Sequence, residues 1–283
     1  MASHRFTRIY SSLLRIVALG REAIELAAKK EIHFLAASIA YYTFAALIPL
    51  LLVAFILASA IGGHDLALRI VVVTQDFLTP TSQELVREAI LQTEGRVGVV
   101  LGAIVVFVWS LFRLLRSLDI AVSIVYETEL SPSMRTQITT AGILFLTLLI
   151  AGSGLIGISV FIAIPSGIPF IGVIAWGTAL IAPVLIFWPI YYLLPAVDHS
   201  IGDAFPGTIV AAGSWILLNV LFGIYTANAG QYFVYGLLGG VLLLLLWFYL
   251  SGMILVFGAV INAVLHRETR SSSRHERGPI IRS

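Results

Sequence analysis

Cysteine is absent from this chain of 283 residues, and charged side chains are scarce. Without cysteine there can be no disulfides, no thiolate metal sites and no Cys nucleophile. Charged residues make up 11% of the sequence, whereas soluble domains carry about 25%. Because so few charges cannot cover a surface that faces water, the composition excludes an ordinary soluble domain.

Long apolar runs account for the missing charge, and 59% of the residues are hydrophobic. Each run is longer than the roughly 20 residues that a helix needs to cross a bilayer core. Backbone groups inside lipid must be hydrogen-bonded within their own segment, which favours helices over isolated strands. The sequence therefore predicts an all-α, polytopic membrane protein, a six-helix transmembrane bundle with spans at about 33–62, 97–118, 138–163, 168–194, 204–227 and 234–265.

Lysine and arginine are distributed unevenly between the two predicted sides. One side carries Arg5, Arg8, Arg15, Arg21, Lys29, Lys30, Arg113, Arg116, Arg135, Arg267, Arg270, Arg274, Arg277 and Arg282, and the other carries only Arg69, Arg87 and Arg96. Basic residues accumulate on the cytoplasmic side of membrane proteins. We therefore expect a multi-pass protein of a prokaryotic cytoplasmic (inner) membrane with both termini in the cytoplasm.

Three segments lie outside the predicted membrane domain of residues 33–265 or form its loops. Residues 1–32 mix apolar and basic positions, which predicts an amphipathic helix lying at the cytoplasmic lipid interface. Residues 64–95 form the only sizeable external segment, where we expect short amphipathic helices. Residues 266–283 are polar and are predicted to be a disordered cytoplasmic tail.

Arg113 and Arg116 are the charges of most interest within the predicted spans. They are three residues apart, so they share one face of the second span, near its cytoplasmic end. One interpretation is that both side chains reach the inner headgroups and only set the topology. The other is an anion site for a lipid phosphate or a carboxylate substrate.

Tyr41, Tyr42, Thr43 and Pro49 interrupt the uncharged stretch AASIAYYTFAALIPLLLVAFILASAIGG. Pro49 lacks a backbone donor and frees the carbonyl of the residue four positions earlier, which favours a kink. The hydroxyl groups either line a substrate path beside this kink or pack between helices around a static bend.

Two asparagines and a glycine pair are candidates for helix packing. Asn219 lies within the fifth span and Asn262 near the inner end of the sixth; a buried Asn usually hydrogen-bonds between helices, and Asn262 is also a candidate substrate contact. Gly236 and Gly240 give a Gly-x-x-x-Gly spacing that permits close helix contact.

Several motifs resemble the YihY/BrkB family of inner-membrane proteins. They include AASIAYYTFAALIPLLL in the first span, VWSLFRLLRSL in the second, and YTANAGQYFVYGLLGG followed by LLWFYLSGMILVFGAVINA near the end. The resemblance covers about residues 33–265 and implies six membrane helices and a role in the cell envelope. Family members have carried the name ribonuclease BN, and others have been linked to lipid or small-molecule transport.

The residues themselves do not favour a nuclease. The six histidines are scattered, no His-x-His-x-Asp-His cluster is present to hold metals, and no phosphate-binding Gly-x-x-x-x-Gly-Lys loop occurs. We therefore expect no enzyme activity, no catalytic residue, no cofactor, no metal and no nucleic-acid partner. The predicted function is transport or binding of a lipid or amphipathic anion, with membrane lipids and their anionic headgroups as partners. The alternative is a scaffolding membrane protein without substrate, and the oligomeric state stays open.

Overall fold

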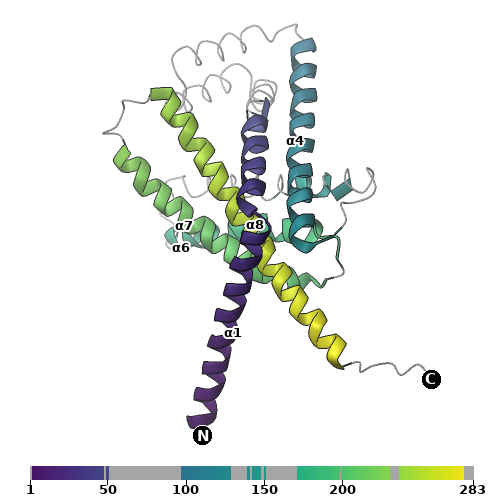
Figure 1. Ribbon diagram of the computed structural model, residues 1–283. Coiled ribbons are helices and arrows are strands. Elements are labelled where there is room, and N and C mark those ends of the chain that lie inside the picture. Colours follow the sequence, from purple (N-terminus) through teal and green to yellow (C-terminus); the bar gives the residue numbers. More distant parts are fainter. Residues whose placement is uncertain are drawn as a thin grey trace, which may run out of the picture. The chain divides into compact units, whose positions relative to one another are not determined.

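A computed structural model of the chain describes residues 2–47, 49–50, 97–128, 139–140, 142–147, 150, 171–197, 199–229 and 236–276. Helices account for nearly all of these residues, and no strand occurs among them (Figure 1). The helices are α1 (Ala2–Lys29), an unlabelled helix Ile32–Leu47, α4 (Val97–Tyr126), α6 (Ile171–Leu193), the 3-10 helix η1 (Ile201–Ala204), α7 (Phe205–Ala229) and α8 (Gly236–Glu276). This agrees with the predicted all-α class.

The predicted spans all contain helical residues within the described part of the chain. Two described helices are long and apolar enough to cross a membrane, Ile201–Thr226 and Gly239–Arg270. Two shorter apolar helices are Ile32–Leu47 and Leu180–Leu193. The number of six spans therefore stays a prediction, as does the external segment 64–95, which lies outside the described residues.

The chain divides into two compact units. The first contains Met1–Ala37, Leu118–Ala229 and Tyr249–Ser283, and the second contains Ser38–Ser117 and Gly230–Phe248. Three of the helices cross this division, so each unit is built from parts of helices that continue into the other.

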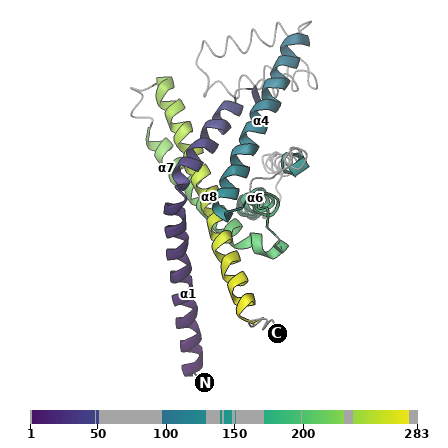
Figure 2. The same ribbon diagram turned by 45° about the vertical axis from the view of Figure 1, so that its right-hand side comes forward.

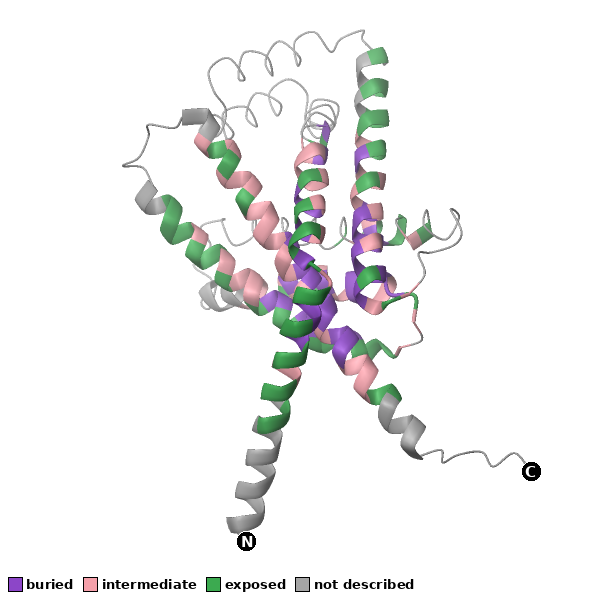
Figure 3. Cartoon of the chain, viewed as in Figure 1, coloured by how far each residue is buried: buried purple, intermediate pink, exposed green. Residues whose placement is uncertain are grey.

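The core of the first unit is the second half of α8, where buried residues gather (Figure 3). Val256, Ala259, Val260, Ala263 and Val264 are buried, and their spacing of three and four residues places them on one face of this helix. Small side chains allow neighbouring backbones to approach closely, which is how helices pack when the surroundings are as apolar as their side chains. α8 is therefore the helix around which the first unit is assembled.

Two glycines bring α8 against its neighbours. A Cβ added at Gly252 would lie 2.9 Å from the carbonyl oxygen of Ala36, in the helix Ile32–Leu47. In both views α8 passes beside the end of α1 (Figure 1 and Figure 2). A Cβ added at Gly258 would clash with the Tyr191 hydroxyl and lie 2.9 Å from the oxygen of Gly207. α6 and α7 also pack against each other, and the rings of Phe187 and Trp215 meet there at 5.7 Å. Glycine is thus required where α6 and α7 contact α8.

The packing glycines differ from the predicted pair. A Cβ at Gly240 would have no neighbour within 4 Å among the atoms that the structure describes, and the surroundings of Gly236 lie outside the described residues. The Gly-x-x-x-Gly spacing shows which glycines share a helix face but carries no information about which face meets a partner. The close contacts that the structure describes occur instead at Gly252 and Gly258 on α8 and at Gly207 on α7.

α8 also extends further than predicted. A disordered tail was expected from residue 266, yet the helix continues through residues 266–276. Each residue added to an existing helix gains a hydrogen bond without a new nucleation cost, so polar residues can follow a long apolar helix. Residues 277–283 lie outside the described part of the chain.

Two helices are followed by a residue other than glycine whose backbone is in the left-handed conformation. Glu31 has φ 49° between α1 and the helix Ile32–Leu47, and Glu127 has φ 56° directly after α4. Behind Glu127, the backbone N–H of Thr128 donates to the oxygen of Ser123 at 3.0 Å, which closes α4 as a Schellman motif does. Glycine or asparagine normally occupies such a position. A specific contact of the Glu127 side chain is therefore expected.

Candidate functional site

Arg113 and Arg116 lie on the part of α4 that belongs to the second unit. Arg113 is exposed and its guanidinium carbon lies 5.2 Å from the centre of the Trp109 ring, which is also exposed. A cation over an indole face is held by the ring quadrupole. Arg116 is half-buried. The structure thus places Arg113 beside an aromatic ring on an outer surface of α4.

The tyrosine pair also belongs to the second unit. The rings of Tyr41 and Tyr42 meet edge to face with centroids 5.3 Å apart, and Tyr41 is 63% exposed. The Thr43 hydroxyl donates to the backbone oxygen of Ile39 at 2.7 Å, so it is satisfied within its own helix. Pro49 is buried. Because Ile48 lies outside the described residues, the predicted kink at Pro49 stays a prediction.

Asn262 lies in the first unit and is 2% exposed. Its Oδ1 accepts a hydrogen bond from the backbone N–H of Gly207 at 2.6 Å, and its Nδ2 donates to the oxygen of Ala204 at 3.1 Å. Gly207 lies in the first turn of α7, whose N–H groups have no partner within the helix. Asn262 therefore caps α7 from the neighbouring α8, and its predicted substrate contact stays a prediction.

Asn219 and Tyr191 show two different uses of a polar group on apolar helices. Asn219 is exposed, and its Nδ2 donates to the Trp215 oxygen of its own helix at 2.8 Å. The buried Tyr191 hydroxyl donates across helices to the Leu255 oxygen of α8 at 2.8 Å. Asn219 thus bonds within α7, whereas Asn262 and Tyr191 bond between helices.

A charged cluster that sequence reasoning missed joins three helix ends in the first unit. Glu127, after α4, lies 2.9 Å from the Nζ of Lys30 after α1 and 3.2 Å from an Nη atom of Arg267 on α8. The hydrogen bond from Lys30, followed by the charges of Arg267 and Lys30, lowers the pKa of the Glu127 carboxyl. These contacts explain why glutamate, rather than glycine, ends α4.

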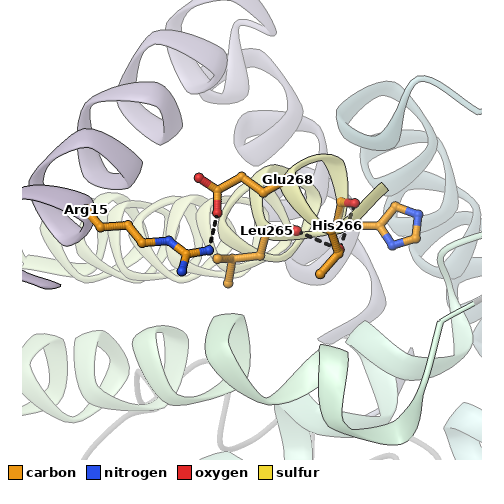
Figure 4. Close-up of polar contacts among 5 residues, drawn as sticks. Arg15, Leu265, His266 and Glu268 are labelled. Atoms are coloured by element: carbon orange, nitrogen blue, oxygen red, sulfur yellow. Dashed lines mark hydrogen bonds and ion pairs between the residues drawn. The ribbon is translucent and has the colours of Figure 1, made fainter. Parts of the chain in front are cut away.

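A second ion pair ties α1 to α8 nearby in the same unit. Arg15 donates from Nη2 to Oε2 of Glu268 at 3.0 Å, and the His266 ring points away from Arg15 (Figure 4). These partners are 253 residues apart in the sequence. No spacing rule reaches across such a distance; the only available signal was that all these residues lie near ends of apolar runs on the predicted cytoplasmic side.

Two pairs of a tyrosine and a histidine ring lie in the same unit as the charged cluster. The Tyr126 and His266 rings lie 6.5 Å apart, and those of Tyr192 and His199 lie 5.5 Å apart. Burial, reinforced by the charge of Asp203, raises the pKa of the Tyr126 hydroxyl well above its usual range, so this group stays protonated. Among the residues that the structure describes, no group of three or more His, Asp or Glu side chains could hold a metal ion.

The chain resembles known proteins over most of its length. The family described as "Virulence factor BrkB" matches residues 23–280. The UPF0761 membrane protein of Kangiella koreensis is 26% identical over 259 residues, covering 88% of this chain and 64% of that protein. The UPF0761 membrane protein of Actinobacillus pleuropneumoniae serotype 5b is 27% identical over 253 residues, covering 83% of this chain and 90% of that protein.

A shorter match concerns YfkH of Bacillus subtilis, which is provisionally named a ribonuclease-like protein. It is 34% identical over 98 residues, covering 34% of this chain and 36% of YfkH. The matches therefore span less than two thirds of both YfkH and the Kangiella protein. No solved structure matches the chain.

Proposed function

This chain belongs to the BrkB family of membrane proteins, and on that premise we propose that it binds or transports a lipid or an amphipathic anion for the cell envelope. Arg113 and Arg116 would receive the anionic head, and Tyr41, Tyr42 and Thr43 would line its path beside a bend at Pro49. The protein would lie in the cytoplasmic membrane, with both termini and the amphipathic α1 on the cytoplasmic side.

The observation that carries this proposal is the exposed Arg113 beside the exposed Trp109 on α4. The same helix exposes apolar residues one to two turns away, including Val105 and Val106, as a lipid-facing helix would. A guanidinium on such a helix is costly unless it meets an anion or water at the interface. Its donors form a planar fork that binds phosphate or carboxylate oxygens in pairs.

A scaffolding protein without substrate is the second candidate, and a different observation favours it. Asn262 and Tyr191, two of the polar groups at depth in the described helices, both bond to backbone groups of neighbouring helices. Such contacts fix helices in place and need no ligand. In a scaffold, Arg113 and Arg116 would only anchor α4 at the headgroups.

Flux measurements in proteoliposomes separate the two candidates. The full chain would be reconstituted with fluorescent anionic phosphatidylglycerol, and transfer between leaflets would be followed by chemical quenching. We expect flux in the unchanged protein and at least a tenfold loss in the double variant Arg113→Gln, Arg116→Gln, because an anion loses about one charge-assisted bond at each site.

Arg21→Gln is the matched control, because Arg21 is an exposed arginine paired with Glu25 within α1. This control should keep the flux of the unchanged protein. Equal flux in the double variant and the control would remove the proposed role of Arg113 and Arg116. Absence of flux in the unchanged protein would favour the scaffold.

A further inference from the structure

Asn219 is a polar residue on the exposed surface of an apolar helix. It lies on α7, which has no charged residue and most of which belongs to the candidate membrane span Ile201–Thr226. α7 continues for ten residues after Asn219. At a rise of ~1.5 Å per residue, its backbone lies roughly 15 Å from that end of the helix. An asparagine side chain is too short to reach the headgroups from this depth, so its amide is exposed at the level of the acyl chains.

The amide of Asn219 is satisfied only in part by its own helix. Its Nδ2 donates one hydrogen to the Trp215 oxygen at 2.8 Å. The amide has a second N–H and the acceptor Oδ1, and neither is hydrogen-bonded in the part of the chain that the structure describes. Acyl chains offer no donor and no acceptor, so a polar group at this depth is stabilised by polar groups of a protein.

The residues around Asn219 form a line along α7 that suits close contact with a second helix. This α7 seam consists of Ile216, Asn219, Gly223 and Thr226. Their spacing of three, four and three residues is that of the contact line between two parallel helices. Gly223 is exposed, and a Cβ added there would have no neighbour within 4 Å among the atoms that the structure describes. Another backbone can therefore approach Gly223 without a clash.

The opposite face of α7 suits acyl chains instead. Leu217, Leu221 and Ile224 lie on that face and are 59%, 56% and 57% exposed. The second half of α7 is largely exposed (Figure 3). From residue 216 to residue 224, every residue except Asn219 and Gly223 is large and apolar. The two exceptions share one side of the helix, which distinguishes a face for a protein partner from a face for lipid.

A second copy of this chain is the partner that this chemistry fits. The uneven distribution of lysine and arginine orients every copy in the same way. The α7 helices of two neighbouring copies are therefore parallel, and their Asn219 side chains lie at the same depth. The amide is self-complementary, because an N–H of each Asn219 can donate to the Oδ1 of the other. Such a reciprocal pair of contacts is what a two-fold axis generates.

We propose that this protein forms a two-fold symmetric dimer in the membrane through the α7 seam. The two Asn219 amides bond to each other at its centre, and Gly223 lies where the helices approach most closely. The contact begins after Ala212, which is 3% exposed and already covered by its own chain. The two copies therefore meet along the second half of α7. The seam includes neither Arg113 nor Arg116, so the dimer stands independently of the proposed transport function.

Disulfide crosslinking tests this geometry, because the chain has no cysteine of its own. Thr226→Cys would be introduced into the full chain, expressed in bacterial membranes and oxidised with copper phenanthroline. We expect a disulfide-linked product of twice the chain mass of 30.7 kDa, because facing positions of two paired helices lie within reach of a disulfide. Ile224→Cys is the matched control, since it is two residues away on the opposite face and should stay monomeric.

Asn219→Leu tests the amide itself, because leucine has a similar size and no hydrogen-bonding group. Sedimentation of the purified chain at increasing ratios of protein to detergent would measure the dissociation constant of the dimer. We expect this constant to rise about tenfold, whereas Leu217→Ala on the opposite face should leave it unchanged. Where the copies are diluted apart, the unfolding temperature of Asn219→Leu should not fall below that of the unchanged protein, because only a contact between copies is lost.

Four results would overturn the proposal. No disulfide from Thr226→Cys, or equal crosslinking from Ile224→Cys, would show that the seam does not face a second copy. A crosslinked product of another mass would mean that a different protein covers the seam. An unchanged chain that is monomeric at every ratio would mean that lipid covers it. A dimer of Asn219→Leu as tight as that of the unchanged protein would show that the amide does not hold the copies together.

Discussion

At the scale of single residues, Glu127 illustrates how a side chain can justify an unfavourable backbone. Its φ of 56° is left-handed, a conformation that costs an L-residue roughly 1–2 kcal/mol. Glycine would adopt it freely, but glycine could not reach Lys30 and Arg267. At this position, the energetic cost of the left-handed backbone is offset by two ion pairs, which connect the residues after α1 and α4 to α8 in the first unit.

Replacing Glu127 by Gln should lower the thermal stability of the purified protein at neutral pH. The folded protein lowers the pKa of this carboxyl from its ordinary value of 4.5. The stabilisation is therefore complete above the ordinary value and is lost as the pH falls through the folded value below it. We expect at most about 1 kcal/mol, because the side chain is half exposed. Unfolding temperatures between pH 7 and pH 3 should converge for the two proteins at the acidic end.

Glu127→Gly is the informative partner of this variant. It loses the same ion pairs but removes the left-handed strain, so it should be more stable than Glu127→Gln at neutral pH. A stability difference between the unchanged protein and the Glu127→Gln variant that stays constant down to pH 3 would contradict the assignment of the effect to the carboxylate.

Sequence reasoning was least informative at this scale. Hydrophobicity shows that Lys30, Glu127 and Arg267 lie at the ends of apolar runs. They are about 100 and 140 residues apart in the sequence, so their contacts depend on how the helices pack. Arg113 and Arg116 were found because a charge inside an apolar run is visible in the sequence itself.

At the scale of elements, the start of α7 is fixed by a residue of α8. Asn262 satisfies one of the N–H groups that α7 cannot pair internally and also binds the Ala204 oxygen at the end of η1. The helices themselves follow from apolar content and could be predicted. Their mutual capping could not, because the sequence of α7 does not contain its capping residue.

Asn262→Ala should destabilise the protein by about 1–3 kcal/mol, because the Gly207 N–H and the Ala204 oxygen would be left buried without this partner. Denaturation by heat or by a strong detergent measures this change. Asn219→Ala is the control, since Asn219 is exposed and bonds within its own helix. Similar losses in both variants would show that the capping bond is not the cause.

The glycines that pack between helices could not be predicted from the sequence either. The sequence has 24 glycines, and spacing singled out Gly236 and Gly240. The structure instead requires glycine at Gly252, Gly258 and Gly207, where an added Cβ would clash with neighbouring residues. Which glycine allows a close helix contact depends on where a partner helix packs, and tertiary packing determines that position.

At the scale of the whole molecule, sequence reasoning was most successful. Charge scarcity and apolar runs predicted a helical membrane protein, and the match of residues 23–280 to the BrkB family agrees with the motifs that first suggested it. Composition indicates a helical membrane protein because charged side chains and unpaired backbone groups are energetically costly at every position inside a bilayer.

The distribution of lysine and arginine predicts that both termini lie in the cytoplasm. Fusions of alkaline phosphatase, which is active only outside the cytoplasm, should be inactive at either end, whereas green fluorescent protein at the C-terminus should fluoresce. An active phosphatase fusion at one end would imply an odd number of spans and would contradict the predicted six.

The ion pair between Arg15 and Glu268 has a consequence for biosynthesis. The ribosome must add 253 residues after Arg15 before its partner exists, and Gly252, the contact of Ala36, appears almost as late. During translation Arg15 therefore has no Glu268 to pair with until almost the whole chain has been made. The ion pair between α1 and α8 is thus one of the last contacts of the first unit that the growing chain can form.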